Sequence, residues 1–103
     1  MCNSACIEFG RESLTRADVE GKMVIEVGAR DVNGTLRPFA EAHQPARYLG
    51  VDLEAGNGVD EICNVYDLAK RVGPESFDVV ISTEMIEHVQ DWRKAFSQIK
   101  TIL

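Results

Sequence analysis

The 103-residue chain is poor in basic residues and has no long uninterrupted apolar run. Its 11 Lys and Arg stand against 17 Asp and Glu, which gives a formal net charge of −6 at pH 7. Nucleic-acid binders need a Lys or Arg at each phosphate contact, so this balance argues against nucleic acid as a partner. It equally disfavours an anionic membrane surface, and no apolar stretch approaches the roughly 18 residues of a membrane-spanning helix.

Cysteine is scarce as well. Cys2, Cys6 and Cys63 are odd in number and irregular in spacing, which argues against a disulfide framework and against a zinc site. The first residues include neither a basic segment nor a long apolar one, so we expect no signal peptide and a cytoplasmic protein. No repeat or linker divides the chain, and 45% apolar residues can form one modest core. We therefore expect a single domain over residues 1–103.

Short apolar runs predict buried strands. They are rich in β-branched residues and end at a glycine or polar residue, a pattern typical of strands covered on both faces of a parallel sheet. Helical patterns alternate with them, which predicts βαβ units and hence an α/β, Rossmann-like fold with a mainly parallel sheet and flanking helices. The predicted strands cover 23–27, 48–51, 77–81 and, more weakly, 59–63; the predicted helices cover 13–20, 35–43 and 92–103.

The last predicted helix has the clearest pattern. Asp91 is a good N-cap, and apolar residues recur after it at intervals of three and four, so we expect the whole stripe to pack in the core. The stripe consists of Trp92, Ala95, Phe96, Ile99, Ile102 and Leu103.

One connection is too short for a helical crossover. Six residues separate Asp52 from Val59, whereas such a crossover needs about 10–12 residues. Asn57-Gly58 in this gap is also a hairpin signal. The chain therefore either returns in extended form to a parallel strand, which we favour, or forms a hairpin.

A glycine-bearing loop follows the first predicted strand. Gly28 allows a ligand to approach the backbone, and Gly34 can adopt a positive φ before the next helix. Arg30 stands where a dinucleotide-binding fingerprint would have its second glycine. Glu26 would repel a pyrophosphate but can hold an ammonium group. Asp52 closes the second strand 18 positions after Gly34, where an acid can accept hydrogen bonds from ribose hydroxyls.

Together these features resemble the class I S-adenosylmethionine-dependent methyltransferases, in particular their small-molecule "type 11" branch. The resemblance rests on Glu26-x-Gly28, on Gly50-Val51-Asp52, and on the phrase from Phe77 to Val89 followed by Asp91-Trp92. It covers about residues 22–103. It implies a sheet of order 3-2-1-4-5-7-6, of which this chain supplies the 3-2-1-4 portion. We therefore expect a truncated, N-terminal cofactor-binding portion of that fold.

The resemblance also implies roles for particular residues toward the cofactor. The loop from Gly28 to Gly34 would pass under the methionine part, with Glu26 near its amino group, and Asp52 would bind the ribose. The adenine would be contacted by the Leu53 side chain, the Asn64 side-chain oxygen (where the family often has Asp) and the Val65 backbone N–H. Ser82 and Thr83 would lie beside the sulfonium.

Two residues admit two interpretations each. Arg30 either assists the cofactor's carboxylate or fills the loop and weakens binding. His88 is a candidate general base near neutral pH, with Glu84 and Glu87 as the nearby acids, or else a cap or packing residue. Methyl transfer depends mainly on proximity and alignment and does not require a base.

The function that follows is methyl transfer from S-adenosylmethionine to a small-molecule acceptor. S-adenosylmethionine and S-adenosylhomocysteine are the expected ligands. The alternative is a non-catalytic module that binds the cofactor or self-associates, and a nicotinamide-dependent enzyme is a distant third. We also expect a homodimer through the edge of the fourth strand. The competing arrangement covers that edge with the segment 6–9.

Overall fold

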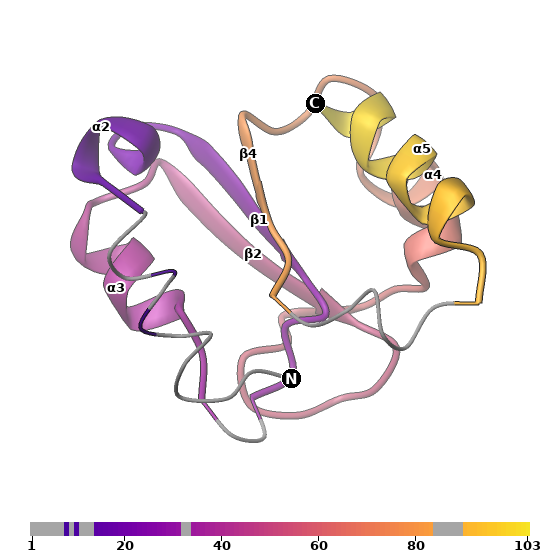
Figure 1. Ribbon diagram of the computed structural model, residues 1–103, viewed down its shortest axis with the longest axis horizontal. Coiled ribbons are helices and arrows are strands. Elements are labelled where there is room, and N and C mark those ends of the chain that lie inside the picture. The colour runs from indigo at the N-terminus through magenta and orange to yellow at the C-terminus, as the bar shows by residue number, and fades with distance from the viewer. Residues whose placement is uncertain (1–7, 9, 11–13, 32–33, 84–89) are drawn as a thin grey trace.

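In the part of the chain that the structure describes, a four-stranded parallel sheet forms the centre (Figure 1). The computed structural model describes residues 8, 10, 14–31, 34–83 and 90–103. The strand order β3-β2-β1-β4 and the parallel pairing confirm the Rossmann-like prediction. The strands are β1 (Met23–Val27), β2 (Arg47–Asp52), β3 (Glu61–Ile62) and β4 (Val79–Ile81).

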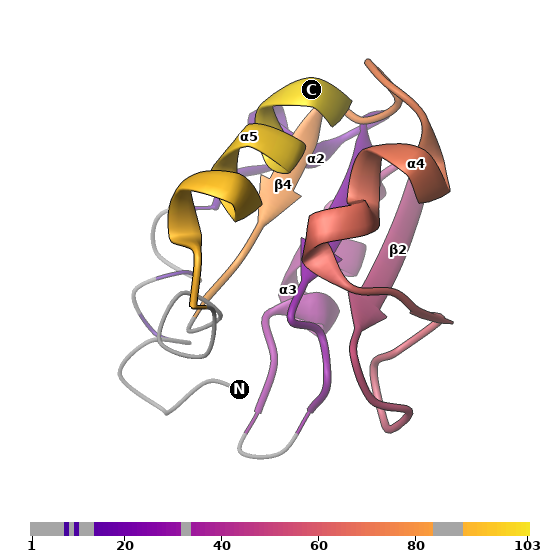
Figure 2. The same ribbon diagram turned by 90° about the vertical axis from the view of Figure 1, so that its right-hand side faces the viewer.

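Helices cover both faces of the sheet. Figure 2 shows α5 over β4 and α4 over β2 on the same face, whereas α2 and α3 lie on the other face. Two apolar clusters correspond to these faces, because alternate residues of each strand point to opposite sides. The helical elements are α2 (Arg16–Val19), α3 (Arg37–Ala42), the 3₁₀ turn η1 (Val65–Asp67), α4 (Leu68–Val72) and α5 (Trp92–Ile102).

The register of β1 shows how the two faces are separated. Ile25 and Val27 belong to the cluster under α4 and α5, whereas Val24 belongs to the cluster under α2 and α3. By alternation, Glu26 therefore faces the α3 side, and it is buried there with 3% of its surface exposed. A buried acid on an apolar strand needs hydrogen-bond partners, and these are described below.

The short connection after β2 returns in extended form to a parallel strand, as we expected. Val51 and Asp52 pair in parallel with Glu61 and Ile62, so the alternative hairpin is not formed. The strand expected over 59–63 is reduced to Glu61–Ile62. The structure adds η1 and α4, which the sequence patterns did not indicate.

Helix α5 agrees with the prediction at its start but not along its whole stripe. The Asp91 side chain accepts a hydrogen bond from the Lys94 N–H at 3.1 Å, as an N-cap does. The expectation of a fully buried stripe is wrong for the outer half of its residues, which are about half exposed. Ala95, Ile99 and Ile102 are buried, whereas Trp92, Phe96 and Leu103 are 49%, 49% and 51% exposed.

Helix geometry explains why the stripe is split. Lys94 and Gln98 face η1 and α4, because Lys94 lies over the Tyr66 ring and Gln98 accepts the Ala69 N–H. At 100° per residue, Trp92 and Phe96 then lie on the opposite flank, beyond the residues that contact the sheet. Within the described part of the chain, β4 is an outer strand of the sheet, so no further strand supports this flank.

Candidate functional site

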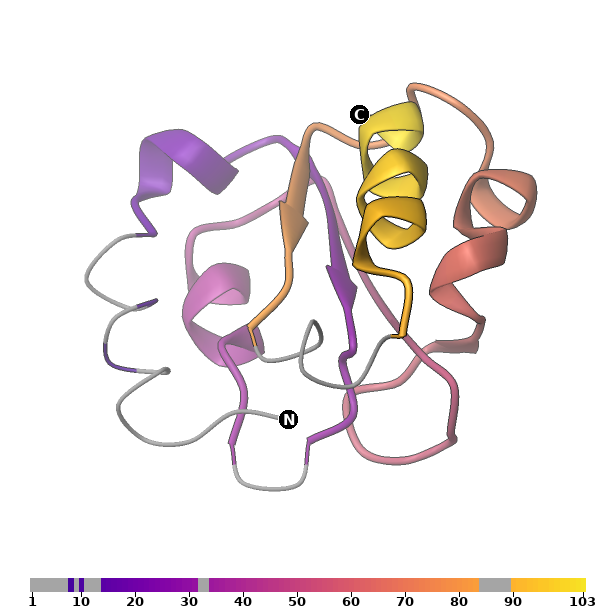
Figure 3. The same ribbon diagram turned by 45° about the vertical axis from the view of Figure 1, so that its right-hand side comes forward.

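The loops that follow β1 and β2 meet at the carboxyl edge of the sheet, at the bottom of Figure 3. Gly28 has φ of +78°, a conformation that favours glycine, and its N–H and that of Ala29 donate to the Val51 carbonyl at 2.9 and 3.0 Å. The Asp31 N–H donates to the Asn57 carbonyl at 2.7 Å. The first loop is thus bound to the end of β2 and to the loop after it. Gly34 is held by its N–H bond to the Asp31 carboxylate.

The Asp52 carboxylate ends β2 at this edge and is half-buried. One oxygen accepts the Arg30 N–H at 3.0 Å, and the other accepts the Glu54 N–H at 3.3 Å. An ionised carboxylate offers about four acceptor positions, so capacity remains for hydroxyl donors. Leu53 follows directly and is 63% exposed. The edge therefore presents a carboxylate and an apolar side chain next to each other.

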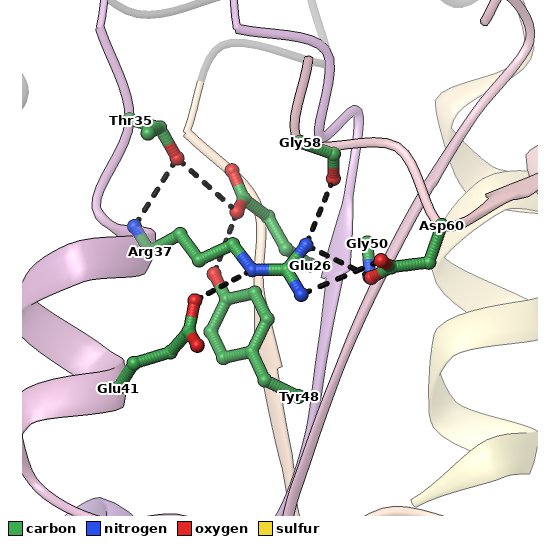
Figure 4. A network of polar contacts seen from close by, with 8 residues as sticks. All are labelled: Glu26, Thr35, Arg37, Glu41, Tyr48, Gly50, Gly58 and Asp60. Carbon is green, nitrogen blue, oxygen red and sulfur yellow. Dashed lines mark hydrogen bonds and ion pairs between the residues drawn. The ribbon is translucent and has the colours of Figure 1, made fainter. Parts of the chain in front are cut away.

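Glu26 is the last residue but one of β1, and its side chain lies on the face of the sheet that α3 covers. One of its oxygens accepts the Tyr48 hydroxyl at 2.6 Å and the Thr35 hydroxyl at 3.5 Å (Figure 4). Burial raises the pKa of Glu26, and the hydrogen bonds from Tyr48 and Thr35 oppose that shift. Burial and the neighbouring Glu26 likewise raise the pKa of Tyr48. Glu26 therefore ties β1 to β2 and to the segment that precedes α3.

The Arg30 side chain reaches from the loop after β1 to the loop after β2, and its effect on cofactor binding stays a prediction. Its guanidinium pairs with the Glu54 carboxylate at 2.7 Å, and its side chain lies against Gly56. Both partners are largely exposed, so the pair contributes little stability by itself. Its effect is to connect the loop after β1 with the loop after β2.

Two of the three residues predicted to contact the adenine, Asn64 and Val65, lie between β3 and α4. The Asn64 side-chain oxygen accepts the Tyr66 N–H at 2.9 Å and thereby caps η1, while Val65 is buried. The Tyr66 hydroxyl accepts the Asp91 N–H at 2.9 Å, which connects this segment to the start of α5.

The end of β4 contributes the last predicted residues. Ser82 is exposed and Thr83 is half-buried, directly after the strand. His88, Glu84 and Glu87 lie outside the described residues, so the general base stays a prediction. Cys2 and Cys6 also lie outside them. Among the residues that the structure does describe, no three His, Cys, Asp or Glu side chains form a group that could hold a metal ion, and no helix is long and apolar enough to cross a membrane.

A separate cavity of about 280 Å³ lies toward the amino ends of β1 and β2. None of the predicted cofactor residues lines it. It is lined by Met23, Arg47, Leu49, Glu61, Arg71, Val72, Ser76 and Phe77. The predicted site is instead the open surface formed by the loops at the carboxyl edge.

A polar network that the sequence patterns did not indicate lies beside this edge, centred on Arg37, Tyr48 and Asp60 (Figure 4). Burial opposes ionisation of Asp60, but hydrogen bonds from the Gly50 N–H and Arg37, and the charge of Arg37, outweigh it and lower the Asp60 pKa. A signal for part of the network was present. An acid at Glu26 on an otherwise apolar strand requires a donor on a neighbouring strand, and Tyr48 is the hydroxyl-bearing residue of β2.

A parallel sheet of this order, with a glycine turn after the first strand and an acid ending the second, defines a Rossmann-like domain of the nucleoside-binding kind. The chain belongs to the class I S-adenosylmethionine-dependent methyltransferases, since a family model described as a methyltransferase domain matches residues 5–103. This confirms the resemblance seen in the sequence, and it confirms S-adenosylmethionine as the cofactor that the family implies.

Two curated relatives and one solved structure illustrate the similarity. The chain is 36% identical to the ubiquinone biosynthesis O-methyltransferases of Idiomarina loihiensis and Thiobacillus denitrificans, over 69% and 75% of its length. It spans 33% and 38% of the length of these two proteins. The fold also matches an S-adenosylmethionine-dependent methyltransferase from Mesorhizobium loti with a TM-score of 0.72, at 21% identity, over 93% of this chain and 47% of that one.

The residues at the carboxyl edge fit this cofactor chemically. Asp52 has acceptor capacity left for ribose hydroxyls, and Leu53 exposes an apolar surface of the kind an adenine ring packs on. The net charge of −6 is compatible with a cationic ligand. Arg30 is the one basic residue of the segment 28–34, and its guanidinium is paired with Glu54, so the turn offers no unpaired cation for a pyrophosphate.

Proposed function

We propose that this chain is the cofactor-binding portion of an S-adenosylmethionine-dependent methyltransferase that acts on a small-molecule acceptor. The observation that carries the proposal is the half-buried Asp52 carboxylate, which ends β2 beside the Gly28 turn and keeps acceptor positions available. Hydroxyl acceptors are the first class to test, since both curated relatives are named O-methyltransferases.

In this proposal each residue contributes to binding and alignment. Asp52 accepts the ribose hydroxyls, Leu53 packs on the adenine, and Asn64 and Val65 border the ring. The turn from Gly28 to Gly34 passes along the methionine part, with Glu26 on the amino-group side. Ser82 and Thr83 border the reacting group, and His88 is the candidate base.

The bound cofactor supplies an electrophilic methyl group on its sulfonium. The contribution of the chain is to hold the cofactor in one orientation, since transfer depends chiefly on the distance and alignment of the two reacting atoms. A carboxylate near the amino group and a generally acidic surface suit a cationic ligand better than they suit a pyrophosphate. This favours S-adenosylmethionine over a nicotinamide dinucleotide.

Asp52→Ala is expected to weaken the binding of S-adenosylhomocysteine roughly ten- to a hundredfold, because hydrogen bonds to a charged group contribute about 1.5–3 kcal/mol. Isothermal titration of the chain with S-adenosylmethionine, S-adenosylhomocysteine and NAD measures this. Asp78→Ala is the control, since the Asp78 carboxylate likewise accepts a backbone N–H, that of Met23, but at the opposite edge of the sheet. Unchanged affinity in Asp52→Ala, or tighter binding of NAD by the parent, would contradict the proposal.

We also propose that two copies of the chain pair through the free edge of β4. Val79–Ile81 is apolar, and within the described residues it pairs on one side only, with β1. The exposed flank of α5, formed by Trp92, Phe96 and Leu103, lies on the side of the helix away from α4. Pairing β4 with β4 about a two-fold axis would satisfy the edge and bring the two flanks near each other.

Sedimentation at micromolar concentration tests the dimer. We expect the parent to sediment at twice the monomer mass of 11.4 kDa and Phe96→Glu to shift it toward the monomer, because a charge is placed in the apolar flank. Leu53→Glu is the control, since Leu53 is an exposed apolar residue at a different edge. A parent that stays monomeric at all concentrations would rule this dimer out.

A further inference from the structure

We infer that Arg37 and Asp60 form a positioning pair that holds the loop 53–60 against α3, and thereby sets where Asp52 and Leu53 stand relative to the Gly28 turn. The inference rests on the proposed function, since it names residues that support the same site. Neither residue is part of the predicted set of cofactor contacts, and both act through other groups.

The loop 53–60 needs such support because it contains no helix that could pack on the sheet. β2 ends at Asp52 and its parallel neighbour β3 begins at Glu61, so the chain reverses and returns within the loop. Parallel neighbours are usually joined by crossovers of a dozen or more residues, most often helical, that pack on the sheet. Here the loop has to be held by individual contacts instead.

Asp60 makes the first of these contacts. Its N–H donates to the Gly50 carbonyl at 2.8 Å, and its carboxylate accepts the Gly50 N–H at 2.7 Å. Both backbone groups of Gly50 are therefore engaged by one residue of the loop. The loop also approaches β2 closely, since a Cβ on Gly50 would lie 2.0 Å from the Gly58 carbonyl oxygen.

Arg37 makes the second contact, from the first turn of α3. Its guanidinium bonds the Asp60 carboxylate at 2.8 and 3.4 Å and the Gly58 carbonyl at 3.2 Å (Figure 4). The same group pairs with Glu41 at 2.7 Å and lies over the Tyr48 ring at 4.9 Å. The planar guanidinium can serve all these partners at once because its five N–H donors point in fixed directions.

The pair thus connects both halves of the cofactor edge. Arg37 lies on the helix that follows the Gly28–Gly34 turn, and Asp60 lies at the end of the loop that begins with Leu53. The side chains of Arg37 and Asp60 are 22% and 40% exposed, and this partial shielding from water strengthens an ion pair relative to a fully exposed one. Losing the pair would free the loop that presents the nucleoside contacts, while the backbone bonds of Gly28 and Ala29 to Val51 would stay in place.

The experiment compares Arg37→Ala and Asp60→Ala with Glu41→Ala. Glu41→Ala is the matched control, because it removes a partner of the same guanidinium within α3 and leaves the contacts to the loop intact. We expect Arg37→Ala and Asp60→Ala to weaken binding of S-adenosylhomocysteine and of free adenosine by roughly tenfold each, and Glu41→Ala to change them less than twofold. The double variant is expected to bind both ligands about as tightly as the weaker-binding of the two single variants, since the two residues act through one contact.

Hydrogen exchange separates positioning from general destabilisation. In Arg37→Ala, exchange of backbone amides is expected to rise in 53–60 and to stay unchanged in β1. Arg37→Lys, which keeps the charge without the planar donor set, is expected to restore binding only in part and provides a second variant if the alanine form does not fold.

The outcomes distinguish this inference from the proposed function. A parent that binds S-adenosylhomocysteine and an Arg37→Ala variant that binds it equally well would overturn the inference alone. A parent that binds neither ligand would overturn the proposed function, and unchanged exchange of 53–60 in Arg37→Ala would then also refute the anchoring of the loop. Equal losses in Glu41→Ala and Arg37→Ala would overturn the inference as well, because they would show that the helix and not the loop contact matters.

Discussion

Gly50→Ala is expected to destabilise the chain by more than about 3 kcal/mol, the upper end of what overpacking costs. A Cβ at this position would lie 2.0 Å from the Gly58 carbonyl oxygen and 3.0 Å from the Ala29 Cβ. The Gly58 carbonyl belongs to a loop that Asp60 fixes to Gly50 by two hydrogen bonds. The Asp60 N–H donates to the Gly50 carbonyl, and the Asp60 carboxylate accepts the Gly50 N–H. The Gly58 carbonyl can retreat only if these hydrogen bonds break. Urea denaturation followed by circular dichroism measures the loss.

Gly56→Ala provides the comparison for this substitution. Gly56 lies in the same loop and is exposed, and its nearest neighbours would be atoms of the flexible Arg30 side chain at 3.0–3.3 Å. We expect its unfolding free energy to stay within about 0.5 kcal/mol of the parent. If Gly50→Ala were equally well tolerated, the close approach of the loop to β2 would be incorrect.

Tyr48→Phe is expected to cost about 2–3 kcal/mol of stability, because it removes the hydroxyl that donates to the buried Glu26 carboxylate at 2.6 Å. The phenyl ring would still lie under the Arg37 guanidinium, so the substitution isolates the hydrogen bond. Thermal and urea denaturation both report the change. Combining Tyr48→Phe with Glu26→Gln is expected to recover part of the loss, since a neutral amide is less costly to leave short of donors than a carboxylate. A purely additive double variant would contradict the coupling.

The same carboxyl predicts a dependence of stability on pH. Burial raises the pKa of Glu26 above its ordinary value of 4.5, so the folded chain binds this proton more tightly than the unfolded chain does. The stabilisation from this group is therefore fully present below about pH 4.5 and is lost as the pH rises through the folded-state pKa. The unfolding free energy of the parent minus that of Glu26→Gln should fall over this interval and then level off. A difference that stays constant from about pH 4 to 8 would refute the assignment.

The architecture could be predicted from the amino-acid sequence because the relevant signals are local. Buried parallel strands are short, continuous apolar runs, and three such runs with helical patterns between them indicate a parallel sheet and its covering helices. The signals for an acid at the end of the second strand and for a glycine turn after the first are likewise local, so the positions of Asp52 and Gly28 could be predicted from the sequence alone. Asp91 caps its helix for the same reason, since an N-cap acts on the backbone three residues away.

Which residues support this edge depends on the tertiary structure. Arg37 and Asp60 are 23 positions apart in sequence, and neither has a local pattern that names its partner. Their pairing depends on the loop after β2 folding back over Gly50. The local sequence of this loop is compatible with several backbone conformations, so it does not select that path. The exposure of Trp92 and Phe96 is also a tertiary result. A helical stripe shows which residues share a face, but how much of that face is covered depends on how far the sheet extends beneath it.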